Sequence, residues 1–211
     1  MMRPLLAALA LAILAACTFD PETGTFVEVK EEPRPVAYVA AKDGAHAIPA
    51  VDASKVPLAY QRTLVPNPLK DEAPGTILVD TQTRHLYLIQ DKRTALRYGI
   101  GVGREGFGWS GETVVARKAH WPTWTPPPEM ITRQPELERW REGQPGGPSN
   151  PLGARAIYLY KDGHDTGFRI HGTPQWQSIG SNASSGCFRM IQQDVLDLYD
   201  RVSPGAKVIV R

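Results

Sequence analysis

The stretch FRIHGTPQWQSIGSNASSGCFRM, residues 168 to 190, contains the two side chains with the greatest chemical potential in the chain. His171 follows an apolar run and precedes Gly172, which predicts a strand that ends at a turn. The run Ser-Ser-Gly before Cys187 predicts a flexible approach with backbone N–H groups free to point at a substrate. Cys187 is a candidate for four roles: a small buried hydrophobe, a metal ligand, half of a disulfide or a nucleophile.

The other of the two cysteines, Cys17, ends the segment MMRPLLAALALAILAAC. A basic start and about a dozen apolar residues fit a secretory signal and are short for a membrane span. An N-terminal anchor helix or a buried core helix is the alternative. The residues Leu-Ala-Ala-Cys, 14 to 17, resemble the lipobox of bacterial lipoproteins, which implies a signal peptide over residues 1–17 and lipid attachment at Cys17.

Cysteine and charge content narrow the class of protein. With Cys17 lipidated, Cys187 would be the only free thiol, so an intramolecular disulfide is excluded and a reactive thiol is favoured. A lone cysteine cannot build a thiolate-rich zinc site, and the five histidines show no metal-ligand spacing. The net charge of +2 gives no indication of a nucleic-acid partner. We therefore expect no metal, no cofactor and no nucleic acid.

The chain divides into an N-terminal segment and a strand-rich domain. Residues 18–72 have prolines at short intervals and no sustained apolar period, which favours an extended tether. From residue 73 to 211, short apolar runs predict strands over 76–80, 85–89, 95–101, 112–119, 156–160, 167–171 and 207–210. A single apolar face over 195–202 predicts one helix, with Asp194 as its N-cap and Ser203-Pro204-Gly205 as its end.

A proline- and tryptophan-rich insertion follows the fourth strand and contains at most one short helix, near residues 134–141. Trp109, Trp121, Trp124 and Trp140 either anchor the core and loops or stack on a substrate. The stretch GGPSNPLG is either a plain loop or a lid.

A cysteine and a histidine can form a catalytic pair. An imidazolium stabilises a nearby thiolate, and the same imidazole can then move protons. The alternatives are an inert buried thiol at Cys187 and a structural histidine at His171. Spacing along the chain does not decide between them, because such pairs are assembled in space.

RIHGT, then IG, then SSGCFRM together resemble the active-site signature of L,D-transpeptidases of the YkuD type. The resemblance extends from about Gly75 to Val210 and implies a mainly β fold, a sandwich with a few short helices. It implies that Cys187 is the nucleophile and His171 its base, with the Gly172 carbonyl orienting the imidazole. Backbone N–H groups of Gly186 and Cys187 would stabilise the oxyanion, each worth roughly 3 kcal/mol.

The resemblance also implies substrate contacts. Arg189 would hold a substrate carboxylate, and Ser184 and Ser185 would lie beside the substrate. The family commonly has a histidine where this chain has Ser185. A serine can donate a hydrogen bond but carries no charge, so we expect a less stabilised thiolate and a lower rate.

The implied reaction is acyl transfer in the bacterial cell wall without a cofactor. The donor would be a peptidoglycan tetrapeptide stem, and the acceptor a second stem, a D-amino acid or a lysine of an envelope protein. A non-catalytic wall-binding lipoprotein and a thiol hydrolase of wall crosslinks are the alternatives. The expected location is the periplasm-facing cell envelope, anchored through Cys17, and Thr18 favours the outer membrane over the inner one.

Overall fold

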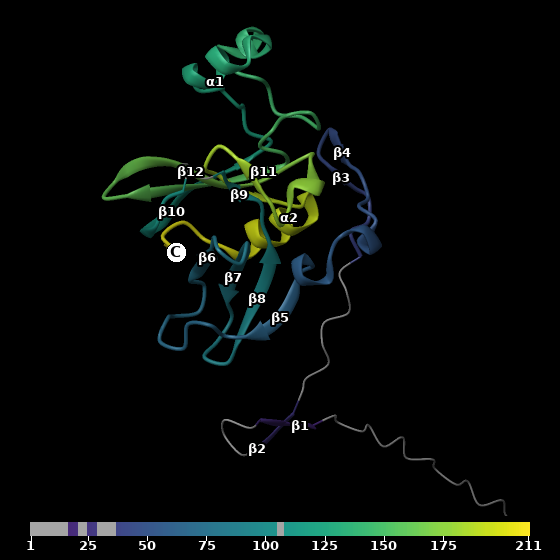
Figure 1. Cartoon of the computed structure of the whole chain (residues 1–211), viewed down its shortest axis with the longest axis vertical. Helices are drawn as coiled ribbons and strands as arrows, with labels where there is room; N and C mark the ends of the chain where they lie inside the picture. Colours follow the sequence, from purple (N-terminus) through teal and green to yellow (C-terminus); the bar gives the residue numbers. More distant parts are fainter. Residues whose placement is uncertain (1–16, 21–24, 29–36, 105–107) are drawn as a thin grey trace, which may run out of the picture. The chain divides into compact units, whose positions relative to one another are not determined.

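The computed structural model describes residues 17–20, 25–28, 37–104 and 108–211 (Figure 1). The chain forms two units, Met1–Arg34 and Pro35–Arg211. In the first unit, β1 (Cys17–Asp20) pairs antiparallel with β2 (Thr25–Glu28). The rest of the expected signal peptide lies outside the described residues. Among those that are described, no helix combines the length and the apolar character that crossing a membrane requires.

The second unit is built on a nine-stranded sheet with the order β14-β12-β11-β10-β15-β6-β7-β8-β5. Neighbouring strands are antiparallel except for β12 with β14 and β15 with β6. The strands are β5 (Thr63–Pro66), β6 (Ile77–Asp80), β7 (His85–Ile89), β8 (Thr94–Gly99), β10 (Gly111–His120), β11 (Arg155–Lys161), β12 (His164–Gly172), β14 (Phe188–Met190) and β15 (Lys207–Val210). Every strand predicted from an apolar run is present.

Small elements complete the unit. They are the hairpin of β3 (Ala41–Asp43) and β4 (His46–Ile48), the parallel pair of β9 (Val102–Gly103) and β13 (Asn182–Ser184), the helices α1 (Pro128–Arg133) and α2 (Gln192–Arg201), and the 3₁₀ helices η1 (Ala53–Lys55), η2 (Leu58–Tyr60), η3 (Pro135–Trp140) and η4 (Trp176–Ser178). The insertion thus has two helical segments where one was expected.

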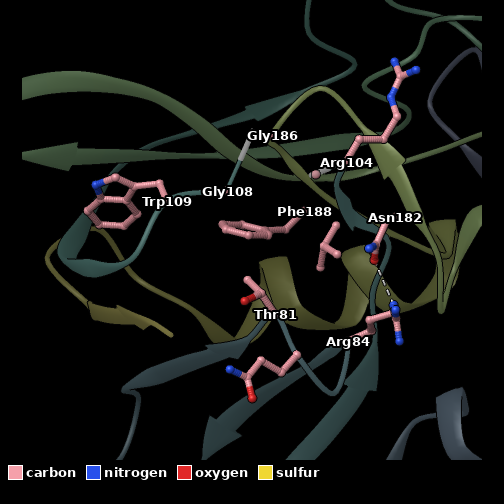
Figure 2. A pocket seen from close by; sticks show the side chains of 11 residues that line it. Thr81, Arg84, Arg104, Gly108, Trp109, Asn182, Gly186 and Phe188 are labelled. Atoms are coloured by element: carbon pink, nitrogen blue, oxygen red, sulfur yellow. Dashed lines mark hydrogen bonds between the residues drawn. The ribbon is translucent and has the colours of Figure 1, made fainter. Parts of the chain in front are cut away.

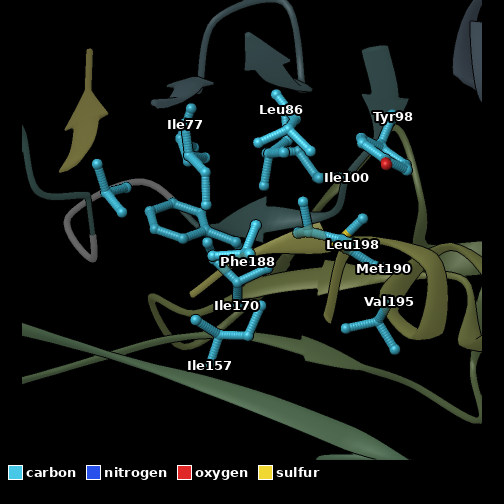
Figure 3. Close-up of a cluster of buried hydrophobic side chains, with 14 of the residues drawn as sticks. Ile77, Leu86, Tyr98, Ile100, Ile157, Ile170, Phe188, Met190, Val195 and Leu198 are labelled. Atoms are coloured by element: carbon cyan, nitrogen blue, oxygen red, sulfur yellow. The ribbon is translucent and has the colours of Figure 1, made fainter. Parts of the chain in front are cut away.

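The two halves of the sheet share one core, as expected for a mainly β sandwich. Alternate residues of each strand point inward, and their side chains meet between the halves and against α2 (Figure 3). The core includes Ile77, Val79, Leu86 and Leu88 from one half, and Val115, Ile157, Leu159, Ile170 and Phe188 from the other. The connection through β15 makes the sandwich a single hydrogen-bonded sheet.

Helix α2 presents the predicted apolar face, because Val195 and Leu198 are fully buried. The prediction that Asp194 caps it was wrong. The helix begins at Gln192, and the buried Asp194 carboxylate accepts a hydrogen bond from the Tyr38 hydroxyl at 3.2 Å. The carboxylate holds a distant segment instead of the helix end.

The expected tether is also largely part of the folded unit. Tyr38 and Val56 pack with Ile191 in a small second core, and β5 pairs with β8 at the sheet edge. The compact unit runs from Pro35, so the described residues before 73 are not an extended linker. The sequence does not predict these contacts. They are made by single side chains in a proline-rich segment that has no repeating apolar pattern.

The insertion is closed at its base by hydrogen bonds between Trp124 and Gln144. Its return stretch, GGPSNPLG, is a fixed loop, because the fully buried Asn150 amide donates to the carbonyls of Pro122, Gln144 and Pro145 at 3.0 Å. Trp121 anchors this region to the N-terminal segment, its indole N–H donating to Asp43 at 2.8 Å.

Candidate active site

Parallel pairing of β12 with β14 sets the positions of the expected catalytic residues. Ile170 lies opposite Phe188, and His171 lies opposite Arg189. Paired residues of adjacent strands share a face of the sheet, and successive residues alternate between faces. Ile170 and Phe188 belong to the core, so His171 and Arg189 lie on the opposite face. Cys187 directly precedes Phe188 and joins them there.

The imidazole of His171 is buried and held in one tautomer. Its Nδ1 lies 2.6 Å from the carbonyl oxygen of Gly172. A carbonyl can only accept, so Nδ1 carries the proton and Nε2 is left to receive one. This geometry agrees with the orienting role expected for the Gly172 carbonyl.

Residue 172 must be small because helix α2 packs directly on it. A Cβ at this position would collide with Oε1 of Gln192 and lie 3.0 Å from Cγ1 of Val195. The Gln192 side chain cannot easily give way, since its Oε1 accepts the Ala154 N–H at 3.0 Å. The carbonyl that orients His171 is thus fixed by the start of α2.

The turn that carries Cys187 is closed by Ser184. The buried Ser184 hydroxyl donates to the Cys187 carbonyl at 2.6 Å and accepts the Gly186 N–H at 3.1 Å. Gly186 has a φ of 121°, a conformation that side chains disfavour.

Two expectations for this turn need correction. Ser184 points inward and stabilises the turn, so it does not lie beside a substrate. The Gly186 N–H is already bonded within the turn, whereas the Cys187 N–H has no hydrogen-bond partner among the residues that the structure describes. Cys187 therefore supplies the better oxyanion donor of the two.

Neighbouring groups shift the pKa of the Cys187 thiol in opposite directions. The residue is partly exposed, and its Sγ makes a long contact of 3.8 Å with the Gly167 carbonyl. Burial of the sulfur raises the pKa of the thiol. The Arg169 backbone N–H and the charges of Arg169 and Arg189 act in the opposite direction, while Asp165 raises the pKa further.

Burial lowers the pKa of His171 to about 4, with Arg189 and Arg169 adding to the effect and the Gly172 hydrogen bond opposing it. Near neutral pH the imidazole is therefore uncharged, and burial favours the protonated form of the Cys187 thiol. Burial of both groups thus favours a neutral imidazole and a neutral thiol over an imidazolium–thiolate pair in the resting site. His171 can act as a base only when it takes the thiol proton during attack.

The remaining predicted residues lie around this pair. Arg189 is half-buried, and its Nη1 contacts Oε1 of Gln175 at 3.3 Å. Ser185 is exposed and makes no hydrogen bond to a described residue. The sequence analysis missed Gln175 and Arg169. Arg169 had a signal, since it lies two residues before His171 and alternation places it on the same face.

A pocket of about 330 Å³ lies beside the turn that carries Cys187 (Figure 2). Trp109 stands at one end, the hydrogen-bonded pair of Arg84 and Asn182 stands at the other, and Phe188 lies between them. Its wall includes Gly186, so a group bound there would touch the turn that carries Cys187. Over the described ranges, no group of three or more His, Cys, Asp or Glu side chains is arranged to hold a metal ion.

The family model for the YkuD L,D-transpeptidase catalytic domain matches residues 74–210. The chain belongs to the YkuD family. Among curated YkuD relatives, Escherichia coli K12 has "Probable L,D-transpeptidase ErfK/SrfK", 32% identical over 70% of this chain and 46% of the relative. The same strain has "Probable L,D-transpeptidase YbiS", 29% identical over 70% and 47%. The chain spans about half the length of these relatives.

Solved structures share the YkuD fold. An L,D-transpeptidase from Mycobacterium smegmatis has a TM-score of 0.50 at 20% identity, covering 66% of this chain and 59% of that one. A Brucella melitensis structure titled "Probable carnitine operon oxidoreductase caia" is 48% identical, with a TM-score of 0.52, covering 71% and 92%. Its title departs from the names of the other relatives.

A dinucleotide-dependent oxidoreductase would need a motif that binds the dinucleotide. GVGREG, residues 101 to 106, matches the spacing GxGxxG. That motif binds a dinucleotide only where it joins a strand to the start of a helix. Here β9 occupies residues 102 and 103, and β10 follows from Gly111. The spacing therefore lacks the context that the motif requires.

Proposed function

We propose that this domain is a cysteine-dependent peptidoglycan L,D-transpeptidase that transfers an acyl group from a tetrapeptide stem to an amine. The main support is the hydrogen bond from His171 Nδ1 to the Gly172 carbonyl. His171 lies on β12, which pairs with β14, the strand that begins directly after Cys187. The hydrogen bond leaves Nε2 as a proton acceptor on the face where the thiol lies. The names of the curated relatives support the same reaction class.

In the first half-reaction, Cys187 Sγ attacks the carbonyl at the L-centre of the third stem residue, and its proton passes to His171 Nε2. The Cys187 N–H stabilises the oxyanion. When the bond to the terminal D-alanine breaks, His171 returns the proton to the departing amine. The acyl group of the third stem residue stays on Cys187 as a thioester. In the second half-reaction an acceptor amine attacks the thioester, and its proton returns through His171 to the sulfur.

Substrate placement follows from the charges near the thiol. Arg189 would bind a carboxylate of the stem, because its guanidinium is half-buried and held by Gln175. The exposed Ser185 adds an uncharged hydrogen-bond donor near Cys187. The acceptor is a second stem, a D-amino acid or a lysine of an envelope protein.

We further propose that the chain is a lipoprotein, acylated at Cys17 and facing the periplasm, with the outer membrane favoured. This rests on the LAAC sequence ending at Cys17 and on Thr18 after it.

The test uses the full chain with Cys17→Ser, so that Cys187 is the only thiol, incubated with purified tetrapeptide muropeptides. Release of D-alanine and a thioester adduct in the intact protein mass are expected, and both should be absent in a variant that also carries Cys187→Ala. The products then separate crosslinking, exchange and hydrolysis. A folded protein that binds the wall but gives neither signal would contradict the proposal and favour a binding lipoprotein.

A further inference from the structure

A cross-strand row of side chains leads across the outer face of the sheet to Cys187. Arg117 on β10 lies opposite Tyr158 on β11, which lies opposite Arg169 on β12. Cys187 directly precedes Phe188, and Arg169 directly precedes Ile170, the register partner of Phe188. The Arg169 backbone N–H is directed at the Cys187 sulfur. The row therefore ends at the nucleophile.

The Tyr158 ring fixes both arginines of this row. The guanidinium carbon of Arg117 lies 3.5 Å from the ring centre, and that of Arg169 lies 4.6 Å from it. A guanidinium over an aromatic face is attracted by the ring quadrupole. Tyr158 is itself buried, so it makes a rigid support.

Arg169 is also held from its own strand. Its two terminal nitrogens each donate to an oxygen of Asp165 at 2.9 Å, and one of them also donates to the Phe168 carbonyl at 3.1 Å. This two-pronged pair and the ring leave the guanidinium little freedom to swing away from the sulfur.

The charged groups around the sulfur come from two strands. Arg169 and Asp165 lie on β12, and Arg189 lies on β14. His171 is neutral near pH 7. Ser185, two residues before Cys187, is uncharged. The Arg169 backbone N–H adds a dipole directed at the same atom.

We propose that Arg169 is a positioning residue that stabilises the Cys187 thiolate through a fixed positive charge and its backbone N–H, with the Arg117–Tyr158 stack holding it in place. Its relevance to catalysis rests on the proposed function of Cys187, but its effect on the thiol does not. Asp165 has two opposite effects, because it anchors the guanidinium while partly neutralising it.

The test measures the rate of Cys187 alkylation by iodoacetamide against pH, in the full chain with Cys17→Ser. Arg169→Gln should move the midpoint up by about one pH unit, a roughly tenfold loss of thiolate at neutral pH. Arg169→Lys, which keeps the charge, should recover part of the shift. Asp165→Asn should move the midpoint down. Arg141→Gln, which breaks a similar two-pronged pair with Glu138 in the insertion, is the matched control and should change nothing.

Opposite shifts are the decisive feature. Arg169→Gln and Asp165→Asn break the same ion pair, so a merely structural role predicts the same direction for both. Equal directions, or no shift in either, would overturn the inference. If Arg169→Gln does not fold, Arg169→Lys decides in its place: a midpoint raised in part supports the inference, and an unchanged or lower one overturns it. Midpoints that move as expected in a protein that forms no thioester would leave this inference standing and remove the proposed function.

Discussion

At the scale of single residues, two adjacent serines have unrelated tasks. Ser184 is buried and closes the turn by two hydrogen bonds, whereas Ser185 is exposed. In the sequence they form an indistinguishable pair before Gly186. Which of them faces solvent depends on the direction of the turn, and no property of a serine in the sequence indicates that direction.

Ser184→Ala should lower kcat/KM roughly 100-fold, because the turn loses both hydrogen bonds and the thiol drifts from its position. D-alanine release from tetrapeptide muropeptides gives the rate, and circular dichroism verifies the fold. Ser185→Ala is the matched control and should stay within a few-fold of the parent. Similar losses in both variants would contradict the assignment of Ser184 to the turn.

The pH profile should reflect the buried imidazole. Because the pKa of His171 is lowered to about 4 from its usual 6.5, the neutral base persists as the pH falls. We expect kcat/KM to hold down to about pH 5 and to decline through pH 4, with the fold monitored at each point. A decline centred near 6.5 would mean that the imidazole is solvated during the reaction.

At the scale of elements, a buried polar network fastens the segment before β6 to helix α2. Arg62 pairs with Asp197 at 2.6 Å and lies 3.7 Å from Asp194. Burial raises the pKa of Asp194 to about 7, and Arg62 and the Tyr38 hydroxyl counteract it. The apolar face of α2 was predictable from its period. The role of its acidic residues was not, because their partners lie in a segment without any period.

Arg62→Met should lower the free energy of unfolding by about 3 kcal/mol, since it leaves the fully buried Asp194 carboxylate without a cation, whereas Asp197 keeps its pair with Arg201. Urea denaturation near pH 7.5 measures the loss. Lys55→Met, which removes the exposed pair of Lys55 with Asp52, should leave the free energy unchanged within error. Equal stability of the two variants would show that Arg62 does not hold the segment.

At the scale of the whole molecule, one curled sheet carries the reaction site at one edge strand and the N-terminal segment at the other. Strand order places β14 and β5 at opposite ends. The strands, and the placement of His171 on the strand that pairs with β14, followed from apolar runs and from the family resemblance. The contacts of Tyr38, β5 and Arg169 could not be predicted, since each involves neighbours that only the folded chain brings together.

A fragment of residues 37–211 should fold with nearly full stability, whereas one of residues 73–211 should melt about 10 °C lower and associate. The shorter fragment exposes the edge of β8 and removes Tyr60, which packs against Gly99 and Gly180. Thermal unfolding and size-exclusion chromatography measure both effects. Equal melting temperatures would show that residues 37–72 add nothing to the stability of the folded domain.

The hydrogen-bonded neck between Trp124 and Gln144 has a consequence for engineering. Chain entry and exit are adjacent there, and the segment with α1 projects from the sheet (Figure 1). A guest peptide or a small reporter domain whose ends lie close together can replace this segment without pulling on β10 or β11. The neck thus provides a ready splice point on this domain.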